Sequence, residues 1–136
     1  MLRNEALLPP WGSYRCGIGV FHPCPTSNRM VCMIDIDLQI RHHFSAGLYA
    51  RQMMLPRGHF AVTHAHHYDH LSILASGEVT VEADGVEKRY TAPAVITIPA
   101  GVHHRIEALE DAVWFCVHAT SETDLDRMDE VLVRSD

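Results

Sequence analysis

Short stretches in which apolar and polar residues alternate recur through the middle of the chain. Such alternation is typical of a β-strand that has one face in a protein core. The Asp84-Gly85 pair lies between two of these stretches and predicts a hairpin, because Asp-Gly accepts the positive φ angles of a type I′ turn. Many short strands with regular turns indicate an all-β sandwich or barrel. The predicted strands cover residues 33–40, 47–55, 78–83, 86–91, 94–99, 104–108 and 112–118.

The two ends of the chain depart from this pattern. Residues 1–32 carry scattered prolines and cysteines with no hydrophobic period, which predicts an irregular N-terminal arm. In residues 121–136, Ser and Thr precede acidic residues, and Leu125 and Met128 follow at helical spacing. This order predicts a short C-terminal helix, capped by Ser or Thr and packed on the barrel. We therefore expect a single domain with the barrel over residues 33–120.

Composition argues against several kinds of partner. The chain has 11 Lys and Arg against 17 Asp and Glu, so its formal charge is −6, and no basic cluster favours nucleic acid or an anionic membrane. No apolar run is long enough to span a bilayer, and the first residues lack the layout of a signal peptide, so we expect a cytoplasmic protein. The four cysteines form no CxxC pair, which predicts reduced thiols.

Histidines recur at even spacing in the segment 58–77. His64 and His66 share one face of a strand, and a bend after them can return His70 to the same side. A fourth histidine, His104, follows a Pro/Gly turn at the start of a later strand. Imidazole suits Mn, Fe, Ni, Cu and Zn, whereas Mg and Ca prefer oxygen ligands. The pattern therefore predicts a site for one divalent transition metal ion.

These two segments resemble the motifs of the cupin superfamily, G(x5)HxH(x3–4)E(x6)G and G(x5)PxG(x2)H(x3)N. His70 replaces the glutamate of the first motif, whereas Pro93 and Ala108 stand where the second motif has glycine and asparagine. The resemblance implies a double-stranded β-helix, a metal ion held by the three matching histidines and His70, and a homodimer, because the family often pairs edge strands. The positions that match are Gly58, His64, His66, Gly77, Pro99, Gly101 and His104.

Four histidines carry alternative interpretations. His70 is either a fourth ligand or a base beside a three-histidine metal centre. His104 is expected to face the interior and His103 to face outward, although the two can exchange roles. His118 shares one face of the last predicted strand with Trp114, and we expect a packed core pair there. The alternative for His118 is a wall of the ligand site.

Replacing the motif's glutamate by His70 removes one negative ligand charge, so an anionic chelating ligand is favoured. We interpret the chain as an oxygenase that acts on a small enol, diketone or phenolic chelator. One alternative is a non-catalytic accessory protein that binds a metal or a ligand. This alternative includes a phage origin, because the C-terminal segment resembles the tail of small phage and prophage cupins.

A second alternative is a metal-dependent isomerase or lyase. Such enzymes usually add a lysine or tyrosine base to the site. The sole lysine, Lys88, lies in a predicted hairpin strand that we expect to be exposed, which counts against this class. Any general base would then be a histidine, a tyrosine such as Tyr49 or Tyr68, or metal-bound hydroxide.

Overall fold

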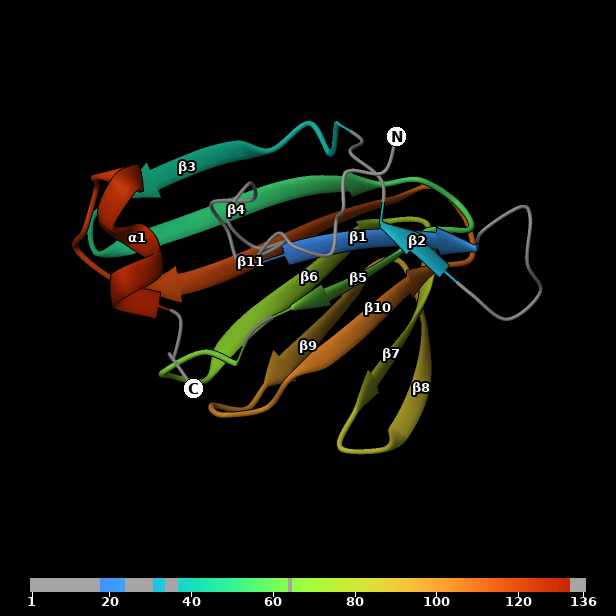
Figure 1. Ribbon diagram of the computed structural model, residues 1–136. Helices are drawn as coiled ribbons and strands as arrows, with labels where there is room; N and C mark the ends of the chain where they lie inside the picture. The colour runs from blue at the N-terminus through green and yellow to red at the C-terminus, as the bar shows by residue number, and fades with distance from the viewer. Residues whose placement is uncertain (1–17, 24–30, 34–36, 64, 133–136) are drawn as a thin grey trace.

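The computed structural model describes residues 18–23, 31–33, 37–63 and 65–132 (Figure 1). Over this part of the chain, short strands follow one another from the first described residue to Ala119, and one helix follows them. The elements are β1 (Ile18–Pro23), β2 (Val31–Met33), β3 (Arg41–Ser45), β4 (Leu48–Leu55), β5 (Phe60–Thr63), β6 (His70–Ser76), β7 (Glu78–Ala83), β8 (Val86–Thr91), β9 (Ala94–Ile98), β10 (His104–Ala108), β11 (Ala112–Ala119) and α1 (Leu125–Leu132).

The strands form two antiparallel sheets. A six-stranded sheet has the order β2-β1-β5-β10-β7-β8, and a five-stranded sheet has the order β3-β4-β11-β6-β9. Strands that are distant in sequence are neighbours in both sheets, as where β4 and β6 flank β11. The all-β fold that we predicted, a double-stranded β-helix with a short C-terminal helix, is confirmed.

The interior of the five-stranded sheet is built in rows. Along β4, β6 and β11, alternate residues are buried, as expected for strands with one face in the core. One interior row is apolar, and polar residues occur in the two rows that follow it toward His118. The interior rows are Met53–Trp114–Leu74, then Arg51–Cys116–Ser72, then Tyr49–His118, with His70 beside His118.

The predicted hairpin between β7 and β8 is confirmed. Asp84 has a φ of 53° and Gly85 a φ of 76°, the two positive angles that a type I′ turn requires. The predicted strand over 33–40 is wrong at residues 37–40, which are irregular, because Gln39 has a φ of 51° and turns the chain out of the extended conformation. Residues 34–36 lie outside the described residues.

Two strands lie in the segment that we expected to be irregular. Strand β1 pairs with β5 from Ile18 opposite Thr63 to Phe21 opposite Phe60, and β2 pairs with β1. The expectation of an irregular arm is therefore wrong for these strands. The pairing of β1 with β5 joins residues distant in sequence, which local periodicity does not reveal, and β2 then pairs with the nearby β1. The rest of the segment 1–32 lies outside the described residues.

The C-terminal helix packs on β4, as predicted. Met128 and Leu132 are buried against Tyr49. The cap is Asp124 rather than Ser or Thr, because its Oδ1 accepts a hydrogen bond of 2.9 Å from the backbone N–H of Asp126. Within the described residues, no helix has both the length and the hydropathy needed to cross a membrane.

Candidate metal centre

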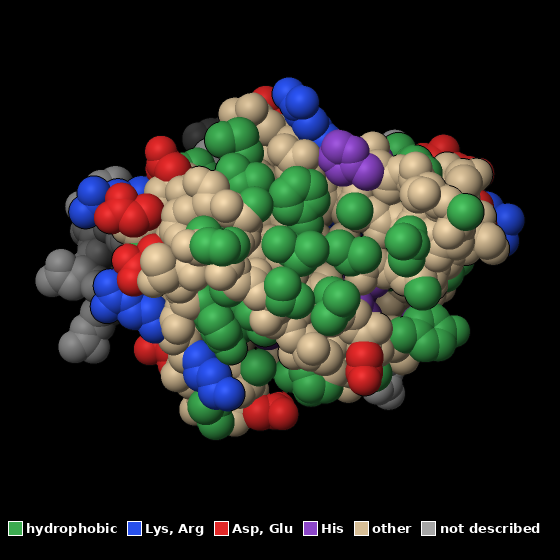
Figure 2. Space-filling model, turned by 180° about the vertical axis from the view of Figure 1, so that it is seen from behind, with side chains coloured by type: hydrophobic (Ala, Val, Ile, Leu, Met, Phe, Trp, Pro, Cys, Tyr) green, Lys and Arg blue, Asp and Glu red, His purple; other side chains and the backbone are tan. Residues whose placement is uncertain are grey.

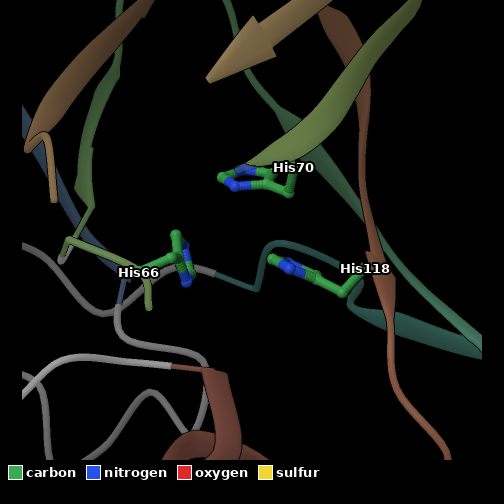
Figure 3. A group of neighbouring side chains, drawn as sticks. All are labelled: His66, His70 and His118. Carbon is green, nitrogen blue, oxygen red and sulfur yellow. The ribbon is translucent and has the colours of Figure 1, made fainter. Parts of the chain in front are cut away.

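Three histidine side chains point toward one another at one end of the interior (Figure 3). Their ring nitrogens lie within 4.8 Å of one another, and all three side chains are buried. The ring of His70 stacks on that of His118 with centroids 4.5 Å apart. The ring of His66 lies 4.6 Å from His70 and 5.0 Å from His118. The three rings therefore enclose a small triangle.

Different elements supply each member of this triangle. His70 is the first residue of β6, and His118 is the last interior residue of the neighbouring strand β11. His66 comes from the loop between β5 and β6. This loop is fixed to the Pro/Gly turn, because Asp69 Oδ1 accepts a 2.8 Å hydrogen bond from the N–H of Ala100 and the His66 carbonyl accepts one of 3.0 Å from Gly101.

The end of α1 orients His66. The carbonyl of Leu132 accepts hydrogen bonds from the backbone N–H of His67, at 2.9 Å, and from Nδ1 of His66, at 3.2 Å. Because a carbonyl only accepts, Nδ1 of His66 carries the hydrogen. Its Nε2 is then the nitrogen that carries the lone pair, which is the arrangement found in histidine ligands of metals.

His104 lies beside the triangle on the opposite sheet. Its ring centroid is 6.2 Å from that of His70, and its Nδ1 is 2.8 Å from the hydroxyl of Thr63 on the adjacent strand β5. His104 is buried whereas His103 is exposed, so the predicted orientations of the two residues are confirmed. His104 does not belong to the group of histidines whose ligand nitrogens lie within 4.8 Å of one another.

The site keeps its imidazoles neutral. Burial out of water lowers the pKa of His118 to about 2, of His70 to about 3 and of His104 to about 4. The positive charge of Arg51 acts in the same direction on His70 and His118. Neutral imidazole is the form that binds metal ions, so these side chains are available as ligands at neutral pH.

The donor set fits a transition metal ion. Within the described residues, both ring nitrogens of His70 and Nε2 of His118 are buried without a hydrogen-bond partner. Buried polar atoms in native proteins nearly always have a partner, so unpartnered atoms at one point need an explanation. Converging imidazole nitrogens in a shielded site match the ligands that Mn, Fe, Ni, Cu and Zn accept.

A family model described as the Cupin domain matches residues 51–118. The chain belongs to the cupin family. A search of curated proteins gives no match. Among solved structures, this cupin is similar to a cupin-2 domain containing protein from Shewanella frigidimarina, at 16% identity and a TM-score of 0.52, over 63% of this chain and 84% of that one.

Two further solved structures show the same fold. The cupin domain of Cnp3 from Schizosaccharomyces pombe has 15% identity and a TM-score of 0.53, over 82% of this chain and 91% of that chain. KdgF from Halomonas sp. has 21% identity and a TM-score of 0.50, over 65% of this chain and 87% of that chain. The likeness thus extends over most of each of these proteins.

The structure brings together only part of the predicted ligand set. His66 and His70 meet as expected, and His104 lies next to them. His64 lies outside the described residues, so its role, like that of His104 as a ligand, stays a prediction. His118 is the member that our sequence analysis assigned to the packed core.

A signal for His118 was present in the sequence. It shares the strand face of Trp114, and that face is the interior one. What the sequence does not show is which strand lies beside β11. The pairing of Val117 with Leu71 brings His118 next to His70, and this pairing joins residues distant in the chain. The alternative that we gave for His118, a wall of the ligand site, describes its position better.

Proposed function

We propose that this cupin binds one divalent transition metal ion, Mn, Fe, Ni, Cu or Zn, through His66 and His70. The candidates for the remaining protein ligands are His118, His104 and His64. The observation that carries the proposal is the convergence of three buried imidazoles, with both ring nitrogens of His70 and Nε2 of His118 lacking a hydrogen-bond partner within the described residues. When bound, the ion supplies Lewis-acid chemistry and, if it is not Zn, redox chemistry as well.

The charge of the site favours an anionic, oxygen-rich ligand. None of the polar side chains that the structure describes as buried is acidic, so no described carboxylate compensates a divalent ion there. The leading function is an oxygenase that acts on a small enol, diketone or phenolic chelator. The buried polar side chains in the described residues are Arg51, Thr63, His66, His70, Ser72, His104 and His118.

A non-catalytic protein that binds a metal or a ligand is the second candidate. It is favoured because, apart from the histidines themselves, the described residues offer no evident general base. Lys88 is exposed on β8, and Tyr68 is exposed as well. Tyr49 is buried, but its hydroxyl is 2.9 Å from Nδ1 of His42 and its ring packs on His118. These positions disfavour a metal-dependent isomerase or lyase.

The partners follow from surface properties. We propose that the protein binds a small-molecule ligand, is cytoplasmic and forms a homodimer. We expect no nucleic-acid partner, because the net charge is −6. The face of the molecule seen from behind carries many hydrophobic side chains and few charged ones (Figure 2). Exposed apolar residues on the five-stranded sheet include Leu48, Leu71 and Val95. Such a face is suited to pairing with a second copy.

Metal content tests the proposal directly. The protein is purified without chelator or nickel affinity steps and measured by mass spectrometry. We expect about one transition metal ion per wild-type chain, and a reduced content in His66→Ala, His70→Ala and His118→Ala. His67→Ala is the matched control, because His67 is next to His66 but exposed. Metal-free wild type from metal-replete cells, or equal loss in the control, would contradict the proposal.

Metal content also tests the predicted ligands, and a second measurement distinguishes the two functional candidates. His64→Ala and His104→Ala lose metal if these residues complete the ligand set. Oxygen consumption by the metal-loaded protein is then measured with a panel of 1,3-diketones and catechols. Turnover supports the oxygenase, whereas tight binding without oxygen consumption supports the non-catalytic protein.

A further inference from the structure

The ring of His118 is packed between other rings. A hydrogen bond to the Leu132 carbonyl orients the imidazole of His66. For His118 the described residues supply stacked rings, with centroids 6.2 Å away for Tyr49 and 4.5 Å away for His70. Tyr49 on β4 and His70 on β6 come from the two strands that flank β11, so the ring of His118 lies between theirs. Stacking therefore fixes its plane.

Tyr49 is itself fixed at both its hydroxyl and its ring. A hydrogen bond of 2.9 Å joins the hydroxyl to Nδ1 of His42, on the edge strand β3. The ring packs against Phe44 of the same strand, with centroids 5.2 Å apart, and against Met128 and Leu132 of α1. Only 1% of Tyr49 is exposed. The hydrogen bond holds the outer end of the side chain, and the packed neighbours hold the plane of its ring.

The orientation of His118 matters because of how an imidazole binds a metal ion. The lone pair lies in the plane of the ring, so a tilted ring directs it away from the ion. Ligand nitrogens of His118, His66 and His70 lie within 4.8 Å of one another, and the three rings point toward one another (Figure 3). The stack with Tyr49 and His70 therefore sets the direction in which His118 offers its nitrogen. Groups that orient a ligand ring in this way strengthen metal binding.

We propose that Tyr49, anchored by His42, is a positioning residue of the metal centre, an inference that rests on the proposed metal-binding function. Tyr49 does not bind the ion. It holds the ring of His118 in the plane that directs a nitrogen to the ion, as the Leu132 carbonyl does for His66. Without the hydrogen bond to His42, the phenol ring can shift and His118 can tilt.

Breaking this hydrogen bond from either side tests the inference. Tyr49→Phe and His42→Leu each remove one partner and keep an aromatic ring at position 49. Cobalt(II) is the probe, because its visible absorption reports the arrangement of its ligands. We expect the cobalt affinity to fall about 10-fold in each variant, the lower end of the range for groups that orient ligands. The absorption spectrum should change in the same way in both.

The double variant and a matched control complete this experiment. Tyr49→Phe combined with His42→Leu should lose no more affinity than either single variant, because both break the same hydrogen bond. His43→Leu is the control: His43 is the next residue of β3, but it is exposed and its Nε2 is 3.0 Å from Oε1 of Gln52. Its cobalt affinity and spectrum should match those of wild type. If Tyr49→Phe does not fold, His42→Leu on the edge strand carries the test.

Nuclear magnetic resonance of the metal-free protein separates positioning from a general structural role. Tyr49 also packs on α1, so a loosened helix would act on the centre through His66. The ring signals of His118 and His66 are assigned by their absence in His118→Ala and His66→Ala. In Tyr49→Phe and His42→Leu we expect the His118 signals to shift and those of His66 to stay. Equal shifts of both rings would overturn the inference.

The outcomes distinguish this inference from the metal proposal. Wild type that takes up no cobalt contradicts metal binding, and the inference that rests on it fails at the same step. Wild type that binds cobalt, with affinity and spectrum unchanged in Tyr49→Phe and His42→Leu, overturns the positioning role alone. Losses that add in the double variant also overturn it, because the two residues then act independently.

Discussion

The individual histidines of the centre have opposite effects on binding and on stability. Their burial keeps the rings neutral and ready to bind a metal ion, but it also withdraws polar groups from water. Without metal, the ring nitrogens of His70 and Nε2 of His118 recover no hydrogen bond from the described residues. Burial of these groups should therefore lower the free energy of unfolding of the metal-free protein, and acid should lower it further.

We predict that the metal-free protein loses stability in mild acid. Histidine in the unfolded chain has a pKa near 6.5, whereas in the folded protein the pKa is about 3 for His70, 4 for His104 and 2 for His118. Below pH 6.5 the unfolded chain therefore binds more protons than the folded one. The free energy of unfolding should fall as the pH falls, by up to about 1.4 kcal/mol per pH unit for each histidine.

Urea denaturation of the metal-free protein at several pH values between 7.5 and 4.5 measures this slope. His118→Gln removes one of the three imidazoles whose pKa is lowered and should reduce the slope by about one proton. His67→Gln, which alters an exposed imidazole, should leave it unchanged. A free energy of unfolding that does not change between pH 6.5 and 4.5 would contradict the neutral, desolvated state of these rings.

Among the residues of the site, the sequence predicted those whose position depends on local spacing in the chain. His66 and His70 lie within one short segment, and the alternation after Pro99 placed His104 inside and His103 outside. His118 was assigned to the core because its neighbours in space are set by strand pairing. The burial of Arg51 was missed for the same reason: a charged residue in an alternating strand is expected to face solvent.

Among the elements, α1 has a larger role than its amphipathic pattern indicates. The pattern predicted packing on the barrel, and Met128 and Leu132 do pack on Tyr49. The helix also ends with the Leu132 carbonyl at Nδ1 of His66, so its docking determines which nitrogen of His66 carries the hydrogen. No sequence signal links this carbonyl to His66, because the two residues are distant in the chain.

Loosening α1 should therefore weaken metal binding. Met128→Ala removes a buried side chain and should lower the free energy of unfolding by about 2–5 kcal/mol. Freeing His66 from its carbonyl acceptor should reduce the metal affinity about 10- to 100-fold. Glu130→Ala, on the exposed face of the helix, is the control. Metal competition with a chromogenic chelator measures the affinity, and unaltered affinity in a folded Met128→Ala protein would refute the positioning role.

Turn chemistry made other elements predictable. Gly77, at a motif position, has a φ of 92°, and a Cβ there would overlap the backbone carbonyl of Asp111, so only glycine fits. The Asp84-Gly85 hairpin is equally local. The strand predicted over 33–40 failed at residues 37–40, because alternation alone does not show that Gln39 leaves the extended conformation. Strands β1 and β2 were missed because β1 is held on the distant strand β5, and β2 pairs with β1.

At the scale of the whole molecule, the two faces of the five-stranded sheet are both rich in apolar side chains. The inner face forms the core, and the outer face carries Leu48, Leu71 and Val95 on three of its strands. Val95 is 65% exposed and lies on β9, the edge strand of this sheet. An edge strand with apolar residues is prone to pair with another chain unless it is covered.

A second copy of the chain is the occupant that we expect on this face. We predict that the wild-type protein is a homodimer in solution and that Val95→Lys shifts it to the monomer, because a charge at the centre of an apolar contact loses its hydration. Leu71→Lys, on the neighbouring strand, should have the same effect. Light scattering coupled to size-exclusion chromatography gives the mass, and circular dichroism checks that the variants fold.

Val86→Lys is the matched control for this prediction. Val86 is 57% exposed, similar to Val95, but it lies on β8 at the edge of the other sheet. The same substitution there adds the same charge without touching the outer face of the five-stranded sheet, so the dimer should persist. A monomeric wild type would refute the dimer, and a dimer that survives Val95→Lys and Leu71→Lys but not Val86→Lys would move the interface to the six-stranded sheet.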